Sequence, residues 1–224
     1  MLGAVRAAVL GGAVVFLVLS WAPAWAQPKE LPAKVVTLSG PAELSRKDAP
    51  NWTAVALRAE VGPGDSVRTQ VGGRIVLKTA SGQAMRLGSR SQLALAAGAD
   101  GGPTRVRFDR GWLWIAVMPG ESEPTQVEVR TPSAIVTVRG GGVGLRRNPD
   151  GSLLVQVHYG SAACAGPDRQ WERTLTGPQQ LLVPASGEPG PPAPVAIDEV
   201  EATWVRWNTD QDVAGGYGGP KPKP

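Results

Sequence analysis

The chain has very few of the residues from which disulfides and metal centres are built. Cys164 is the only cysteine and His158 the only histidine among the 224 residues. A single cysteine cannot form an intramolecular disulfide, and a single histidine excludes a multi-histidine metal site. We therefore expect stability to come from a hydrophobic core alone, and we expect no cofactor.

Sequence motifs of common enzyme classes are also missing. No serine lies in a Gly-x-Ser-x-Gly motif and no Gly-Lys-Ser/Thr is present. The glycine-rich stretch at 140–144 departs from Gly-x-Gly-x-x-Gly because Leu145 takes the last position. These glycines are predicted to mark a bulge or a crowded strand crossing.

Five single residues have side chains that could support catalysis. The three aspartates are predicted to lie in turns, where Asp commonly bonds to its own backbone. The histidine ends a predicted strand without an evident orienting partner, and the cysteine among alanines fits a buried thiol better than a reactive one. The five residues are Asp65, Asp109, Asp150, His158 and Cys164. We predict that none of them is catalytic. The competing hypothesis is a hydrolase that uses the carboxylates in the turns.

The N-terminus has the pattern of a secretory signal peptide. Arg6 supplies the positive charge, residues 7–19 are apolar and uncharged, and Ala24-Trp25-Ala26 has the small residues of a cleavage site. The alternative, an uncleaved membrane anchor, would have to include Pro23 in its span. We predict a cleavable signal peptide over residues 1–26, no transmembrane anchor after cleavage, and a periplasmic or secreted protein.

Residues 34–184 have the pattern of an all-β domain. Apolar and polar residues alternate in short runs, and turn pairs such as Asp150-Gly151 separate the runs. The alternation predicts a two-layer sandwich or short β-roll of many short strands. Residues 112–117 are apolar on both faces and are predicted to form a central strand, whereas residues 51–56 have helix-like spacing and are read as irregular.

The C-terminal region is predicted to contain a linker, a helix and a tail. Residues 185–197 are rich in proline, which opposes both helix and sheet pairing. Residues 198–210 are predicted to form a short amphipathic helix, capped by Asp198, with Val200, Trp204 and Trp207 on one stripe. This helix either docks on the β domain or meets a partner. Residues 211–224 are predicted to be a disordered tail.

Charge and tryptophans suggest what the chain could bind. The net charge is +4, and basic and acidic residues are interspersed, which argues against a nucleic-acid partner. Trp112 and Trp114 lie on one face of the same predicted strand, where they either pack in the core or form a platform for a sugar ring. With Trp204 and Trp207 they make up the candidate binding surface.

A string of short motifs resembles the FecR-type periplasmic domain over about residues 35–183. Residues 64–69 match that family's Gly-Asp-x-Val-x-Thr with Gly64, Asp65, Val67 and Thr69. Residues 111–113 resemble its Gly-x-Leu, and residues 127–132 its Val-x-Thr-Pro. The chain departs from the family's Val-Arg-Gly-Thr, because Arg139 and Gly140 are followed by Gly141.

The resemblance implies a non-catalytic periplasmic interaction or sensing module of the cell envelope, similar to the periplasmic half of signal-transduction regulators. Its partner would be an envelope protein, and the alternative is binding of cell-wall glycan. Only Met1 to Val5 precede Arg6. We therefore expect a stand-alone protein without the cytosolic anti-sigma domain and without direct contact with a cytosolic sigma factor.

Overall fold

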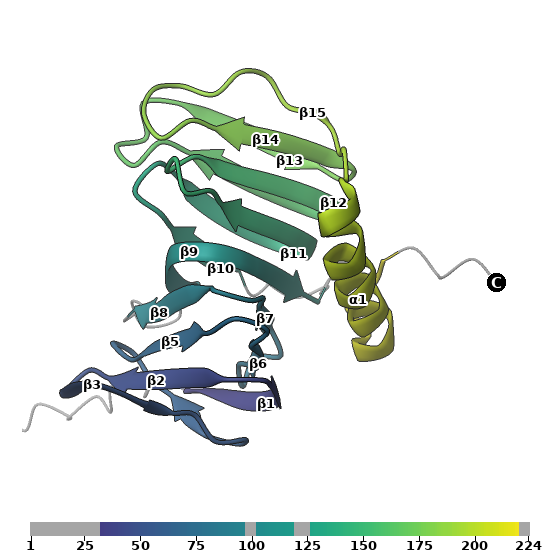
Figure 1. The fold of residues 1–224 in the computed structure, drawn as a ribbon. Coiled ribbons are helices and arrows are strands. Elements are labelled where there is room, and N and C mark those ends of the chain that lie inside the picture. The colour runs from purple at the N-terminus through teal and green to yellow at the C-terminus, as the bar shows by residue number, and fades with distance from the viewer. Residues whose placement is uncertain (1–31, 97–101, 119–125, 220–224) are drawn as a thin grey trace, which may run out of the picture.

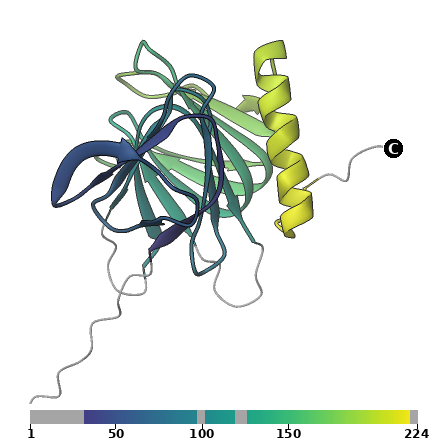
Figure 2. The same cartoon turned by 60° about the horizontal axis from the view of Figure 1, so that its bottom comes forward.

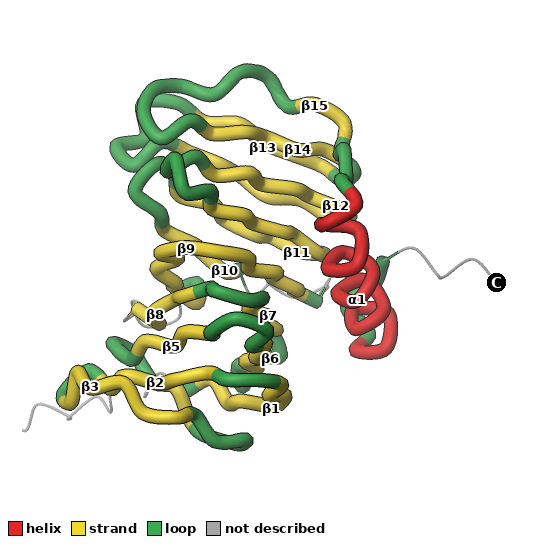
Figure 3. The backbone as a smooth tube through the Cα atoms, viewed as in Figure 1, coloured by secondary structure: helices red, strands yellow, loops and turns green. Residues whose placement is uncertain are grey.

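The alternation of apolar and polar residues forms a long series of strands. The computed structural model describes residues 32–96, 102–118 and 126–219, so the predicted signal peptide and the last five residues of the predicted tail lie outside the described residues. The prediction of an all-β fold with one C-terminal helix is confirmed (Figure 3). The elements are β1 (Ala33–Ser39), β2 (Ala42–Arg46), β3 (Ala49–Ala54), β4 (Glu60–Val61), β5 (Ser66–Thr69), β6 (Arg74–Lys78), β7 (Ala84–Leu87), β8 (Gln92–Ala96), β9 (Thr104–Val117), β10 (Val127–Arg130), β11 (Ile135–Arg147), β12 (Leu153–Ala165), β13 (Glu172–Thr176), β14 (Gln179–Val183), β15 (Ala193–Pro194) and α1 (Glu199–Gly215).

The fifteen strands of the described residues belong to one continuous, strongly curved sheet (Figure 1). The main strand order is β15-β14-β12-β11-β10-β9-β7-β6-β1-β4, and β2, β3, β5, β8 and β13 pair off this path. The long strand β9 joins the N-terminal strands to the C-terminal ones (Figure 1). Its second half pairs antiparallel with both β7 and β11, which confirms that residues 112–117 form a central strand.

The sheet curls around one hydrophobic core. This core takes residues from nearly every strand, from Ala33 in β1 to Val183 in β14. Along β9, Leu113, Ile115 and Val117 point into it. The alternate residues Trp114 and Ala116 lie on the opposite face and are also fully buried. Burial on both faces explains why this strand is apolar throughout.

The β11–β12 hairpin is bulged where the glycine-rich stretch lies, as predicted. Its register shifts twice, between Val138 and Gly140 and between Gly142 and Val143. Gly141 has a φ of 98°, and a Cβ atom there would collide with the carbonyl oxygen of Tyr159. A threonine at this position, as in the family motif, would be strained. The departure from Val-Arg-Gly-Thr therefore accompanies a local backbone that requires glycine.

Two sequence predictions about where strands form are wrong. Residues 51–56, read as irregular, mostly belong to strand β3, in which Trp52 pairs with Ser45 of β2. In the predicted linker, Ala193 and Pro194 form strand β15 and pair with β14. Proline is tolerated there because β15 is an edge strand and needs no second hydrogen-bonding partner.

The C-terminal helix is longer than the sequence predicted. It begins after the cap Asp198, whose side chain accepts a hydrogen bond from the Glu201 N–H, and it continues to Gly215. Gly216 caps the other end in the left-handed conformation, with a φ of 77°. Tyr217 is buried and its hydroxyl donates to the Gly82 carbonyl at 2.6 Å. Residues 211–217, predicted as disordered tail, are therefore ordered. Among the described residues, no helix is long and apolar enough to cross a membrane.

Candidate functional site

Helix α1 docks on the outer face of the sheet, against β7, β9, β11 and β12 (Figure 2). Its buried residues are polar: Glu201, Asn208 and Asp212 are 2%, 0% and 0% exposed. Val200 is 77% exposed, so its place in the predicted apolar stripe is wrong. The docking itself, one of the two predicted alternatives, is confirmed. The helix is held mainly by a buried polar stripe.

Asp212 is the centre of that polar stripe. Its carboxylate accepts hydrogen bonds from Arg86 Nη1 at 2.5 Å, from Trp114 Nε1 at 2.8 Å and from the Tyr159 hydroxyl. Burial raises the pKa of Asp212. The positive charge of Arg86 and the three hydrogen bonds lower it and offset part of this effect. Burial together with the adjacent Asp212 carboxylate raises the pKa of Tyr159 far above its ordinary value.

Arg146 anchors the other end of the helix. Its Nη1 lies 2.7 Å from Glu201 Oε1 and 3.5 Å from Asp198 Oδ2. The same guanidinium lies over the Trp112 ring, 5.0 Å from the ring centre. Arg146 therefore links the helix to Trp112 in β9.

The four candidate tryptophans are divided between the interior and the rim of the helix interface. Trp114 is 0% exposed beneath α1 and stacks on His158, with ring centres 4.8 Å apart. Trp112 and Trp204 both pack against Gly88, and Trp204 stacks on Trp207 at 5.5 Å. Of the two alternatives for the strand pair, core packing holds for Trp114, and only Trp112 borders an open groove. The indole N–H of Trp114 instead donates a hydrogen bond to Asp212.

We call this open groove, which has a volume of about 550 Å³, the arginine groove. Four chain segments form it: the turn between β5 and β6, the turn between β7 and β8, the bend in β9, and the end of β11 with the following turn. Trp112 forms part of its wall and no acidic residue lines it among the described residues. Its lining residues are Val71, Ser89, Arg90, Arg110, Gly111, Trp112, Arg146, Arg147, Asn148 and Pro149.

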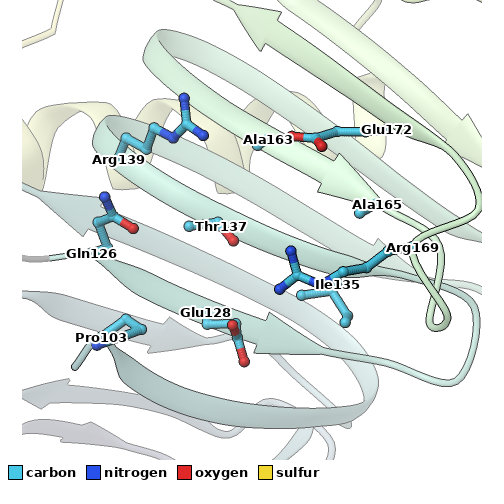
Figure 4. Close-up of a pocket in the computed structure, with 10 residues that line it drawn as sticks. All are labelled: Pro103, Gln126, Glu128, Ile135, Thr137, Arg139, Ala163, Ala165, Arg169 and Glu172. Carbon is cyan, nitrogen blue, oxygen red and sulfur yellow. The ribbon is translucent and has the colours of Figure 1, made fainter.

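A second, smaller pocket of about 230 Å³ lies on the sheet across β10, β11, β12 and the following turn (Figure 4). Thr137 lies at its centre, and Arg139, Arg169, Glu128 and Glu172 stand around it. Arg139, a motif residue of the sequence prediction, is exposed here. Glu128 is 2.7 Å from Arg130 and 3.6 Å from Arg105. Charges of both signs surround this pocket, in contrast to the arginine groove.

The Gly-Asp-x-Val-x-Thr motif is structural. Asp65 Oδ1 accepts the Lys47 N–H, and Oδ2 accepts the Gly62 N–H and Arg46 Nη1, at 3.0, 3.0 and 2.7 Å. Burial alone would raise the pKa of Asp65, but these donors outweigh it and hold the pKa below its usual range. Val67 is fully buried, and Thr69 Oγ1 donates to the Gly88 carbonyl at 2.5 Å.

The other residues with catalytic side chains have structural environments. Asp150 accepts both the N–H and the hydroxyl of Ser152, while Asp109 binds Arg107 and Gln92. Cys164 is buried, which is the alternative that the sequence favoured. Burial raises the pKa of its thiol to about 12, so the thiol stays protonated at neutral pH. Burial lowers the pKa of His158 to about 4. Within residues 32–96, 102–118 and 126–219, no group of three or more His, Cys, Asp or Glu could hold a metal ion.

Residues 65–163 match the family model described as FecR protein. This part of the chain is similar to a FecR domain. The resemblance read from the short motifs is thereby confirmed over these residues. Among curated proteins, none matches the chain.

The chain also shares its fold with solved structures. Two crystal structures of candidate anti-sigma factors from Parabacteroides distasonis, at 1.65 and 2.50 Å resolution, align with TM-scores of 0.51 and 0.52 and 18% identity. The alignments cover 64% and 68% of this chain, and 64% and 74% of those chains. The chain thus spans just under two thirds of the first structure. At this identity the likeness establishes a shared fold.

Sequence reasoning missed the arginines of the groove. It also missed the role of Asp212 at the interface between the helix and the sheet. The groove arginines lie in three separate segments, and none of these segments is a cluster of basic residues large enough to stand out. Asp212 lies 126 positions from Arg86 in the sequence, inside a segment predicted to be disordered. The only local signal was Gly215-Gly216, which is typical of a helix C-terminus and places the helix end beyond residue 210.

Proposed function

We propose that this chain is a non-catalytic interaction or sensing module of a bacterial envelope signalling system. The observation that carries this proposal is the FecR domain at residues 65–163. The shared fold with candidate anti-sigma factors adds support for a role in signal transduction. The module acts in the periplasm after removal of residues 1–26, and its partner is an envelope component.

The arginine groove is the recognition surface in this proposal. It is concave, positively charged, and large enough for a small ligand or for side chains of a partner. Arginine and tryptophan are both enriched among residues that dominate binding energy at interfaces. The neighbouring docked helix fixes Arg146 and Trp112 before any partner binds.

Two measurements test the proposed function in the source bacterium. A photo-crosslinking amino acid at the exposed position Ser89 should capture a defined envelope component, whereas the same amino acid at exposed Ala202 on α1 should not. Deleting the gene should change the abundance of a specific set of transcripts, and the wild-type chain should restore it. An unchanged transcript profile would refute the signalling role.

The predicted location has its own test. Mass analysis of protein from the envelope fraction should show a mature chain that starts at Gln27. A full-length chain embedded in the membrane would show that residues 1–26 act as an anchor.

Glycan binding is the second candidate function, and Trp112 at the edge of the groove is the observation that favours it. Purified mature protein should then sediment with cell-wall material, and Trp112→Ala should abolish the sedimentation. Trp207→Ala is the control, because Trp207 does not line the groove.

A further inference from the structure

The arginine groove concentrates positive charge that carboxylates of the described residues neutralise only in part. Of its four arginines, only Arg146 forms an ion pair with a carboxylate of the described residues. Arg147 Nη1 donates to a neutral acceptor, the Asp109 carbonyl, at 3.0 Å. The acidic residues next to the lining residues in the sequence are engaged elsewhere, since Asp109 binds Arg107 and Asp150 binds Ser152. The groove therefore favours an anion.

The guanidinium groups are attached to ordered backbone. The bond to the Asp109 carbonyl holds Arg147 at the end of β11. Arg90 has a φ of 55°, which is uncommon outside glycine, and its N–H donates to the Gln70 carbonyl at 3.2 Å. Arg110 precedes Gly111, whose φ of 89° forms the bend in β9. The bond to the Asp109 carbonyl lowers the entropy that ordering the Arg147 side chain would cost on binding, and the backbone of Arg90 and Arg110 is already fixed.

The number and type of these groups favour phosphate over carboxylate. Guanidinium forms paired hydrogen bonds with phosphate or carboxylate oxygens, and lysine cannot reproduce that geometry. A carboxylate has two oxygens and one charge, whereas a terminal phosphate has three free oxygens and about two charges. Three arginines without a carboxylate partner therefore match a phosphate better.

The groove is larger than a free phosphate needs, and part of its lining is apolar. Its volume of about 550 Å³ lies in the usual range for sites that hold organic ligands. Val71, Trp112 and Pro149 line it beside the arginines, and Val71 is 63% exposed. The phosphate should therefore carry an organic group that contacts these residues.

We infer that the arginine groove binds a phosphate ester, through Arg90, Arg110 and Arg147 on the phosphate and Val71, Trp112 and Pro149 on the attached organic group. This inference rests on the proposed function and names the ligand chemistry of the same groove. In the envelope such a group occurs on sugars and on lipid headgroups, which share this chemistry.

Titration of the mature full-length chain with defined probes tests the inference. The soluble probes are glucose 1-phosphate, glucuronic acid and glucose, followed by calorimetry or NMR. The lipid probes are phosphatidylcholine vesicles with and without phosphatidic acid, whose headgroup is a terminal phosphate. We expect saturable binding of glucose 1-phosphate at least about tenfold tighter than glucuronic acid, and no binding of glucose. Binding to the anionic vesicles alone would support the inference and assign the phosphate to a lipid.

Paired variants separate a built site from general charge attraction. The double variant Arg110→Gln/Arg147→Gln should weaken phosphate binding at least about tenfold, and Arg110→Lys/Arg147→Lys should recover only part of the affinity. Arg58→Gln/Arg206→Gln is the matched control, because it removes two exposed arginines outside the groove. Unchanged melting temperatures confirm that each variant is folded.

Several outcomes would overturn the inference. One is the absence of saturable binding of any probe up to about 10 mM, which is weaker than a specific small-ligand site needs. Others are binding of glucose or glucuronic acid as tight as glucose 1-phosphate, or equal losses in the groove and control variants. None of these results bears on the transcript response, so the proposed function would stand or fall separately.

Discussion

Arg86 and Asp212 form a buried ion pair across the interface between the sheet and the C-terminal helix. Their side chains are 3% and 0% exposed, and Arg86 Nη1 lies 2.5 Å from Asp212 Oδ1. Charges are costly to remove from water, so each of these groups depends on the other. The helix is consequently attached at a specific position and in a specific orientation.

Removing the carboxylate should strongly destabilise the protein. Asp212→Ala leaves the Arg86 charge buried without its partner and should lower the free energy of unfolding by about 3–5 kcal/mol. Asp210→Ala, on the exposed side of the same helix, should change it by less than about 0.5 kcal/mol. Denaturant unfolding measures both. Equal, small effects would show that the pair contributes little to stability.

Removing the helix should expose the surface that it covers. A chain ending at Pro194 lacks α1 and Tyr217, so Trp114 and Tyr159 lose their cover and Arg86 loses its partner. We expect a lower melting temperature and increased binding of a dye that reports apolar surface. A truncated chain that melts like the full-length protein and binds no dye would contradict the docking described above.

Asp65 should matter for stability and not for binding. Asp65→Ala removes acceptors from two backbone N–H groups and from Arg46, which should cost on the order of 1–2 kcal/mol. Because the folded pKa is lowered, this contribution is present above the unfolded pKa of about 3.9 and is lost as pH falls through the folded value. Asp48→Ala, at an exposed position, is the control for thermal melts. Lost partner binding with an unchanged melting temperature would instead make Asp65 a functional residue.

His158 should make the protein sensitive to mild acid. Its pKa is lowered to about 4 by burial, and its Nε2 is buried without a hydrogen-bond partner among the described residues. Between pH 6.5 and 4 the unfolded chain therefore binds a proton that the folded chain does not, so stability falls as pH falls through this window. The loss should total on the order of 2–3 kcal/mol. His158→Gln, which carries no titrating imidazole, should remove this part of the pH dependence in denaturant unfolding. An identical pH dependence in both proteins would refute it.

The glycine at position 141 should resist replacement, although the family motif has threonine there. Gly141→Thr places a side chain at a φ of 98° and against the Tyr159 carbonyl, which should cost at least about 3 kcal/mol. Gly140→Thr is the matched control, because a Cβ atom there would meet nothing within 4 Å. Thermal melting compares the two variants. If Gly141→Thr were tolerated as well as the control, the bulge would have to be adaptable.

Features that depend on neighbouring residues could be predicted from the sequence. Alternation at i and i+2 indicated strands such as the one through Val127 and Val129, since one face of each strand must be buried. Asp65 was predicted to bond nearby backbone groups, and one of its bonds reaches only to Gly62. The order of the short motifs was also enough to indicate the FecR domain.

The buried face of the helix and the groove were decided only by the tertiary structure. Hydrophobicity favoured Val200, Trp204 and Trp207, but the sheet offers Arg86, Tyr159 and the indole N–H of Trp114, so the helix turns Asp212 toward them. A charged residue is stable in the interior only when a partner is there, and these partners lie 53 to 126 positions away. The arginine groove likewise exists only because β9 and three turns that are distant in the sequence meet in the folded sheet. Local pattern therefore determined the strands, while long-range pairing of polar groups decided where the helix docks and where the groove opens.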